Sequence, residues 1–386
     1  MDQESPDEQR PTWAEIHLNN LAFNLRSVRN FLGNSVDVLA VVKANAYGHG
    51  ALRCSQRLEA EGIQWFGVAI PEEAVELRKG GIRGQILCMG GFWPGQERLI
   101  LQHDITPVAY RIDAARSLND AAQAFGRSQR VHIKIDTGMV RIGLRYDEVE
   151  SFLDELKEFR ALSVEGLMTH FAAADDLGQN AFTALQSERL YDALSKFKAA
   201  GFDPSIVDLA NSPGAIAHRE YKGDLIRLGG VLYGLGGDVL PREIPIPELK
   251  PVLSLHSRIA HIKNVPAGES LGYGRTFSTS RHSMIATVPI GYDDGYQRSL
   301  SNNSRVIVNG KYAPVVGRIS MDWTIVDVTD VPNAAVGDAV LLIGLDKSGL
   351  SIFAEELAAA SKTISYEITC GISSRVPRIF LQSDDT

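Results

Sequence analysis

The sequence contains little cysteine and no long apolar segment. Cys54, Cys88 and Cys370 are far apart and odd in number, which argues against a disulfide framework and a zinc site, so we expect reduced thiols and no metal. No uninterrupted apolar run approaches the ~20 residues that a membrane-spanning helix needs. The acidic start also lacks the apolar core of a secretory signal. We therefore expect no membrane association and a cytoplasmic location.

The chain lacks the excess of basic residues that nucleic-acid-binding proteins carry. Its 39 lysines and arginines are outnumbered by 47 acidic residues, which gives a net charge of -8 at pH 7. This balance argues against nucleic acid as a main partner. Hydrophobic residues make up 44% and charged residues 22% of the 386 residues, as in ordinary globular proteins, and this length favours two domains.

Apolar runs and helical patterns alternate along roughly the first 235 residues. Eight runs that are typical of buried strands are separated by amphipathic helical patterns. The runs are Val38–Val42, Trp65–Ile70, Gln85–Met89, Ile105–Tyr110, Val131–Ile135, Val164–Thr169, Ile206–Leu209 and Leu225–Leu228. Such alternation predicts a parallel sheet, and eight units in this length predict a (β/α)8 barrel. A doubly wound open sheet is the alternative, but no GxGxxG motif follows the first strand.

A proline-rich segment, residues 236–251, separates this pattern from a different one. Beyond it, short alternating segments between glycine and asparagine turns predict a small, mainly β domain with one helix near Ser351–Ala360. The fold class is therefore α/β, with a C-terminal β domain. We expect a flexible tail over residues 1–12, a barrel over residues 13–240 and the β domain over residues 241–386.

Lys43 stands where the first predicted strand opens into a loop, within VVKANAYGHG (Val41–Gly50). A lysine at this place either reaches out to solvent or is used for its amine, because desolvation lowers the pKa of a lysine and suits it to Schiff-base chemistry. The spacing alone leaves both interpretations open. The ends of other predicted strands carry further polar residues, namely Lys134, Arg141, His170, Ser212, Arg227, Gly229 and Gly230.

These strand ends predict a cofactor site. The functional residues of barrels project from the carboxyl ends of the strands, so the amine, the histidine and the two arginines would share one end. Backbone amides of the turns at Asn211–Gly214 and Gly229–Gly230, together with Ser212, would hold a phosphate. An amine near a phosphate site inside a barrel indicates pyridoxal 5′-phosphate (PLP) bound as a Schiff base.

Ten motifs resemble those of the alanine racemase family, in the same order and with matching spacing. The resemblance extends from about Trp13 to Phe380. The motifs are VVKANAYGHG (Val41–Gly50), KIDTGMVRIG (Lys134–Gly143), THF (Thr169–Phe171), LANSPG (Leu209–Gly214), IRLGGVLYG (Ile226–Gly234), LGYGRTF (Leu271–Phe277), IGYDDGY (Ile290–Tyr296), VGRISMD (Val316–Asp322), ISYE (Ile364–Glu367) and RVPRIF (Arg375–Phe380). The resemblance implies an isomerase that interconverts L-alanine and D-alanine with PLP and supplies D-alanine for peptidoglycan.

Racemisation removes a proton from one face of the Cα atom and returns a proton to the other face, so it needs a proton carrier on each face. By resemblance, Lys43 handles the proton of D-alanine and Tyr273 that of L-alanine. A tyrosine has an ordinary pKa of about 10 and needs help to act as a base. The family implies His170 beside Tyr273 and Arg227 behind His170, with Arg227 also facing the pyridine nitrogen of PLP.

The resemblance also implies binding residues and a homodimer, because Tyr273 of the family reaches the site of the partner chain. The phosphate contacts would be Tyr47, Ser212, Gly229, Gly230 and Tyr366. The family has a bulkier residue at Gly230, so that contact is through the backbone. Substrate contacts would be Arg141, Met321 and Tyr292, and the entry channel would be lined by Tyr292, Arg298, Arg318 and Asp175. Lys134 matches a lysine that is carbamylated in some members.

Three alternatives remain beside this interpretation. A broad-specificity amino-acid racemase shares the fold, but such enzymes tend to be exported and the missing signal argues against one. A PLP-dependent decarboxylase would lack the pairing of Lys43 with Tyr273 and needs a suitably placed cysteine, for which Cys370 is not convincing. A non-catalytic PLP-binding protein is typically a barrel alone, without the second domain.

Overall fold

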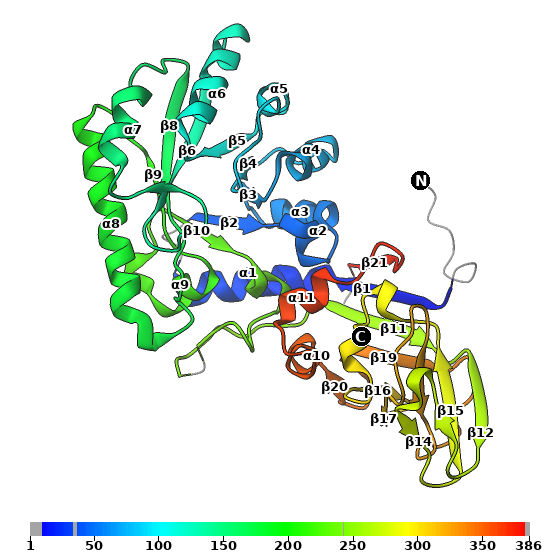
Figure 1. Cartoon of the computed structure of the whole chain (residues 1–386). Helices are drawn as coiled ribbons and strands as arrows, with labels where there is room; N and C mark the ends of the chain where they lie inside the picture. The colour runs from blue at the N-terminus through cyan, green and yellow to red at the C-terminus, as the bar shows by residue number, and fades with distance from the viewer. Residues whose placement is uncertain (1–9, 34–36, 242, 383–386) are drawn as a thin grey trace.

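The computed structural model describes residues 10–33, 37–241 and 243–382, which form a parallel barrel and a mainly β part (Figure 1). This arrangement confirms the predicted fold class. The barrel strands are β2 (Asp37–Val41), β3 (Trp65–Val68), β4 (Gln85–Cys88), β5 (Thr106–Ala109), β6 (Gln129–Asp136), β8 (Leu162–Met168), β9 (Ile206–Asp208) and β10 (Leu225–Leu228). Each predicted apolar run therefore contains or overlaps one strand.

The eight strands are parallel and follow the order β10-β2-β3-β4-β5-β6-β8-β9. The two ends of this row meet where the Asp224 amide donates to the Val207 carbonyl at 2.8 Å and the Arg227 amide to the Ala210 carbonyl at 2.9 Å. The sheet is therefore nearly closed. A two-residue strand, β7 (Leu144–Arg145), lies beside β6.

Helices surround the strands as an outer layer (Figure 1). They are α1 (Leu18–Leu32), α2 (Lys43–Tyr47), α3 (Ala51–Ala60), α4 (Pro71–Lys79), α5 (Glu97–Gln102), α6 (Ile112–Ala124), α7 (Val149–Leu156), α8 (Asn180–Ala199) and α9 (Ser212–Ala217), with short 3-10 turns η2 (Leu177–Gln179), η3 (Arg219–Tyr221) and η4 (Gly230–Tyr233). In α1, the residues Leu18, Leu21, Leu25 and Val28 are buried. Their three- and four-residue spacing gives the helix one apolar face, which packs on the core.

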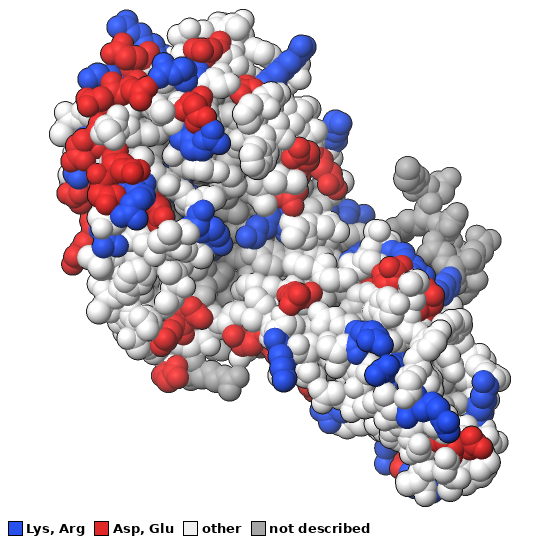
Figure 2. Space-filling view, viewed as in Figure 1, with Lys and Arg blue, Asp and Glu red and all other residues white. Residues whose placement is uncertain are grey.

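The surface carries both signs of charge. On the face seen in Figure 2, acidic and basic side chains are interspersed, most densely over the helices at the outer side of the barrel. Within the described part of the chain, no helix is both long and apolar enough to cross a membrane.

The second part contains mainly antiparallel sheets, with a parallel pair between β1 (Thr12–His17) and β21. Its elements are β11 (Leu253–Arg258), β12 (His261–Val265), β13 (Ser270–Leu271), η5 (Tyr273–Arg275), β14 (Phe277–Ser278), β15 (Ser283–Val288), η6 (Tyr292–Asp294), η7 (Arg298–Leu300), β16 (Arg305–Val308), β17 (Lys311–Pro314), β18 (Thr324–Asp327), β19 (Ala339–Leu345), β20 (Ser351–Ile352), α10 (Ala354–Ser361), α11 (Ser365–Cys370) and β21 (Arg378–Leu381). The prediction of one helix here was wrong. Lys362 ends α10 in a left-handed conformation, with φ 59°, and a second helix begins at Ser365.

The first strand, β1 (Thr12–His17), belongs to the sheet of the second part, where it pairs with β11 and β21. Residues 1–9 of the predicted tail lie outside the described residues. Arg10 is placed, and its guanidinium pairs at 2.6 Å with the buried Asp294. The strand β1 belongs to the sheet of the second part and leads directly into α1, the first helix of the barrel part. The predicted domain boundaries at residues 13 and 241 stay a proposal.

Replacing Ile16 tests whether β1 contributes to the core of the chain. Ile16 is fully buried, so Ile16→Ala is expected to lower the free energy of unfolding by about 2–4 kcal/mol through lost apolar contact and a residual cavity. The measurement is the urea concentration at the unfolding midpoint. Val336→Ala is the control, since Val336 is 61% exposed. Equal midpoints for the two variants would contradict the role of β1 in the core.

Candidate active site

A cavity of about 570 Å³ lies at the carboxyl end of the barrel strands. Ten of the residues predicted for the site line it together: Lys43, Tyr47, Lys134, Arg141, His170, Ser212, Arg227, Gly229, Gly230 and Tyr366. Asp175, predicted for the entry channel, lines it as well. Because Tyr366 lies on α11 and most of the others on barrel strands and loops, both parts of the chain build this cavity.

Lys43 is followed by a turn of unusual handedness. The four residues from Ala44 to Tyr47 have φ between 52° and 54°, which is left-handed and costs L-residues roughly 1–2 kcal/mol each. The His49 ring offsets part of this strain, because its Nδ1 donates to the carbonyl oxygens of Ala46 at 3.0 Å and Tyr47 at 2.9 Å. Backbone strain of this kind is typical of functional sites. The turn directs both Lys43 and Tyr47 into the cavity.

The electrostatic environment of Lys43 favours a neutral amine. Burial lowers the pKa of Lys43, and the guanidinium of Arg141 lowers it further. Arg227 acts in the same direction, whereas Glu73 and Cys370 raise the pKa. A lowered pKa of this kind suits a nucleophilic or proton-accepting lysine. Lys43 lines the cavity, and its functional role stays a prediction.

Arg227 holds the site together from inside the barrel. Its Nη2 donates to His170 Nδ1 at 3.1 Å and to the carbonyl of Thr169 at 2.9 Å, while its Nη1 forms an ion pair with Asp208. An arginine only donates, so His170 accepts at Nδ1 and carries its proton on Nε2. Burial and the charge of Arg227 hold the pKa of His170 well below its ordinary value. His170 is therefore a neutral imidazole, and its Nε2 lies 3.5 Å from Nδ2 of Asn211.

Asp208 is a residue that the sequence interpretation missed. It is fully buried at the end of β9, and burial raises its pKa although Arg227 lowers it. The signal in the sequence was an acidic residue within an apolar run, where it ends β9 and pairs with Met168, the last residue of β8. Buried behind the cavity lining, Asp208 offsets the positive charge of Arg227 and of the neighbouring Lys134.

Two glycines and two tyrosines form a concave set of hydrogen-bond donors. A Cβ atom at Gly229 would lie 2.5 Å from the Tyr47 hydroxyl, and one at Gly230 would lie 2.2 Å from the Tyr366 ring. The two tyrosine rings meet edge to face, with their centroids 5.2 Å apart. Burial raises the pKa of both tyrosines, so their hydroxyls stay protonated. The Gly229 amide donates to Oγ of Ser212 at 2.9 Å, and together with Ser212 this set fits a phosphate group.

Tyr273, Tyr292 and Met321 do not lie at this cavity. They are on the surface of the second part and are 71%, 41% and 51% exposed. Their loops are tied together, because the Tyr292 amide donates to the Ser320 carbonyl at 3.0 Å and Arg375 bonds to acidic residues beside both loops. Arg298 and Arg318, predicted for the channel, are exposed on this same part.

The chain resembles known proteins over nearly its whole length. The family models described as alanine racemase, N-terminal domain, and alanine racemase, C-terminal domain, match residues 16–236 and 252–380. An alanine racemase of Geobacter sulfurreducens is 42% identical over 378 residues, covering 97% of this chain and 98% of the relative. One of Halothermothrix orenii is also 42% identical, covering 96% of each chain.

Solved structures agree with this likeness. An alanine racemase of Clostridium difficile superposes with a TM-score of 0.91 at 35% identity and covers 97% of both chains. An alanine racemase of Bartonella henselae with covalently bound pyridoxal phosphate has a TM-score of 0.84 at 30% identity, covering 97% of this chain and all of that one.

Lys134 is expected to make stability depend on pH. Burial, Arg227 and Arg141 lower its pKa from 10.5 to about 7. The unfolded chain therefore binds more protons than the folded chain between pH 7 and 10.5, so the free energy of unfolding rises with pH in this window. Lys134→Met is expected to reduce this slope by up to about 1.4 kcal/mol per pH unit, as measured by urea unfolding at several pH values.

The exposed Lys157, paired with Asp154 at 3.3 Å, provides the matched control, and Lys157→Met is expected to leave the slope unchanged. Parallel curves for the native chain and Lys134→Met would show that Lys134 keeps an ordinary pKa.

Proposed function

The chain belongs to the alanine racemase family, and from this premise we propose that it interconverts L-alanine and D-alanine with PLP as its cofactor. The observation that carries this proposal is the joint placement of a low-pKa lysine, a phosphate-binding set of donors and a neutral histidine in one cavity. In a PLP-dependent racemase, a lysine amine binds the cofactor, hydrogen-bond donors hold its phosphate, and neighbouring groups assist proton transfer at the Cα atom.

The residues of the cavity fit PLP. The Lys43 amine would bind its aldehyde carbon. The hydroxyls of Tyr47, Ser212 and Tyr366 and the backbone at Gly229 would hold its phosphate, while Arg227 would face its ring nitrogen. Bound PLP supplies an electron sink that acidifies the Cα–H bond of an attached amino acid. A guanidinium keeps its proton, so Arg227 would limit this sink and favour proton return over side reactions.

Lys43 and Tyr273 would move protons on opposite faces of the Cα atom. The lowered pKa of Lys43 favours the unprotonated amine that accepts a proton. Nε2 of His170, which lies 3.5 Å from Asn211 Nδ2, would turn its N–H toward the Tyr273 oxygen and stabilise its deprotonated form. Arg141 lies in the cavity and would bind the substrate carboxylate.

We further propose a homodimer in which each chain completes the cavity of the other. Tyr273, Tyr292 and Met321 are exposed in their own chain and lie outside its cavity. An exposed tyrosine at the surface of a domain is well placed to enter a neighbouring chain. Met321 and Tyr292 would then contact the substrate, and the channel would be lined by Tyr292, Arg298, Arg318 and Asp175.

Lys134 is proposed to carry a carbamate. With its pKa lowered to about 7, its neutral amine would attack carbon dioxide and lose a proton, giving an anion beside Arg141. Mass spectra of bicarbonate-containing preparations that show only unmodified Lys134 would contradict this.

The proposed product, D-alanine, would serve peptidoglycan synthesis, and the cytoplasmic location stays a prediction. A broad-specificity racemase would act on larger side chains as well.

One observation favours the alternative of a PLP-dependent decarboxylase: Cys370 lines the cavity, contrary to the sequence interpretation. However, burial raises the pKa of its thiol, which leaves it protonated, and release of carbon dioxide would separate the two activities.

Incubation with L-alanine and PLP in heavy water tests the activity. We expect the Cα proton signal to disappear in NMR spectra while the optical rotation decays to zero. Tyr273→Phe is expected to reduce the rate by at least about 100-fold, because one face loses its proton carrier, with PLP still bound. Tyr191→Phe, which changes a 44% exposed tyrosine on α8, is the control. Untouched alanine would refute the substrate, and serine, lysine and arginine would be tested next.

Mixing two inactive variants tests the shared site. Lys43→Ala and Tyr273→Phe chains are each expected to be inactive. If Tyr273 acts in the partner chain, each mixed dimer has one intact site of two, so random mixing restores roughly a quarter of the native activity. If Tyr273 acts in its own chain, no activity returns on mixing.

A further inference from the structure

Glu73, on the first turn of α4, joins two segments that are far apart in the sequence. Its Oε2 accepts from the amides of Ala69 at 2.7 Å and Ile70 at 3.4 Å. A glutamate often caps the start of its own helix in this way. Its Oε1, however, accepts from the amide of Ala44 at 2.7 Å, 29 residues earlier in the chain. Capping alone does not account for this second bond.

The Ala44 amide lies at a critical point of the backbone. Ala44 directly follows Lys43 and is the first of the four left-handed residues. An amide at the start of a helical turn has no partner within that turn. Ala44 is exposed, so without Glu73 its amide would hydrogen-bond to water, which does not tie the turn to another segment. The Glu73 carboxylate supplies that partner and ties the turn to the loop after β3.

The same carboxylate acts on the charge of the Lys43 amine. Burial, Arg141 and Arg227 lower the pKa of Lys43, whereas Glu73 and Cys370 raise it. The nearby Lys134 and His170 are themselves affected by Lys43. Among these groups, Glu73 contributes a carboxylate and so offsets the arginines.

We propose that Glu73 is a positioning residue for Lys43: its carboxylate holds the left-handed turn in place and puts a negative charge beside the amine. The importance of Lys43 rests on the proposed function, but the contacts of Glu73 do not. Glu73 would act through the backbone and the field at Lys43, without touching substrate.

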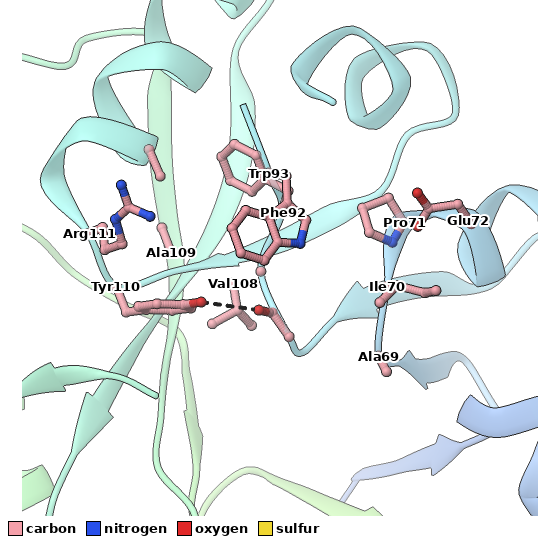
Figure 3. A pocket seen from close by; sticks show the side chains of 13 residues that line it. Ala69, Ile70, Pro71, Glu72, Phe92, Trp93, Val108, Ala109, Tyr110 and Arg111 are labelled. Carbon is pink, nitrogen blue, oxygen red and sulfur yellow. Dashed lines mark hydrogen bonds between the residues drawn. The ribbon is translucent and has the colours of Figure 1, made fainter. Parts of the chain in front are cut away.

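Glu72 offers a matched control one residue away. It lines a separate hollow of about 350 Å³ beside Ile70, Pro71 and Trp93 (Figure 3). Its carboxylate accepts from Gln96 Nε2 at 2.7 Å. Glu72 thus has the same charge on the same helix turn, but makes no contact with the turn after Lys43.

The test compares Glu73→Gln, Glu73→Asp and Glu72→Gln in the full-length chain. Competitive acetylation at a series of pH values, read by mass spectrometry, gives the labelling midpoint of Lys43. Amide hydrogen exchange reports on residues 44–47. Circular dichroism confirms that each variant is folded, and borohydride reduction after addition of PLP shows whether Lys43 takes up the cofactor.

For Glu73→Gln, we expect the Lys43 midpoint to fall by about half a unit to one unit, because a negative charge is lost. Exchange at residues 44–47 should accelerate about tenfold. Glu73→Asp keeps the charge but is too short to join both segments, so exchange should accelerate with a smaller change in midpoint. Glu72→Gln should change neither quantity.

The proposal is overturned if Glu73→Gln and Glu72→Gln give the same Lys43 midpoint, or if exchange at residues 44–47 is unchanged in both Glu73 variants. If the midpoint shifts as expected but PLP is reduced onto a different lysine, the proposed function fails while the inference about Glu73 stands.

Discussion

The left-handed turn after β2 is the constraint on which the rest of the site depends. Four residues with positive φ are unfavourable by several kcal/mol together, so the surrounding structure must stabilise them. His49 binds two carbonyl oxygens from one side and Glu73 binds an amide from the other. The turn is therefore stabilised by the adjoining residue His49 and by a second segment of the chain that carries Glu73.

This turn also joins the two parts of the chain. A Cβ atom at Gly48, which ends the turn, would lie 2.0 Å from the Thr369 carbonyl oxygen. The Gly48 carbonyl in turn accepts from Arg378 Nε at 3.1 Å. The backbone of the turn is thus packed directly against α11, which carries Tyr366. As a result, the barrel and the second part must be assembled before the cavity has its shape.

At the cavity, burial and the closeness of several cations both lower the pKa values of lysine and histidine side chains. Lys43, Lys134 and His170 lie near Arg141 and Arg227, and each of their pKa values is lowered. Arginine keeps its charge under these conditions, whereas lysine and histidine lose a proton more readily. The arginines therefore act as permanent cations that favour the neutral forms of their neighbours, while the buried Asp208 limits the total positive charge.

The barrel and eight of the cavity residues followed from the sequence pattern, because side chains at the carboxyl ends of parallel strands meet at one end of a barrel whatever their distance in the chain. Tyr47, Tyr366 and the place of Tyr273 outside its own cavity followed from the motifs shared with the family. The pairing of Asp208 with Arg227, the bond of Glu73 to the turn after Lys43 and the place of Cys370 at the cavity were found only in the folded structure. These three features depend on contacts across the fold or on the packing of one part against another. No local pattern of residues records such contacts, since the partners are brought together only by the closed sheet and the second part.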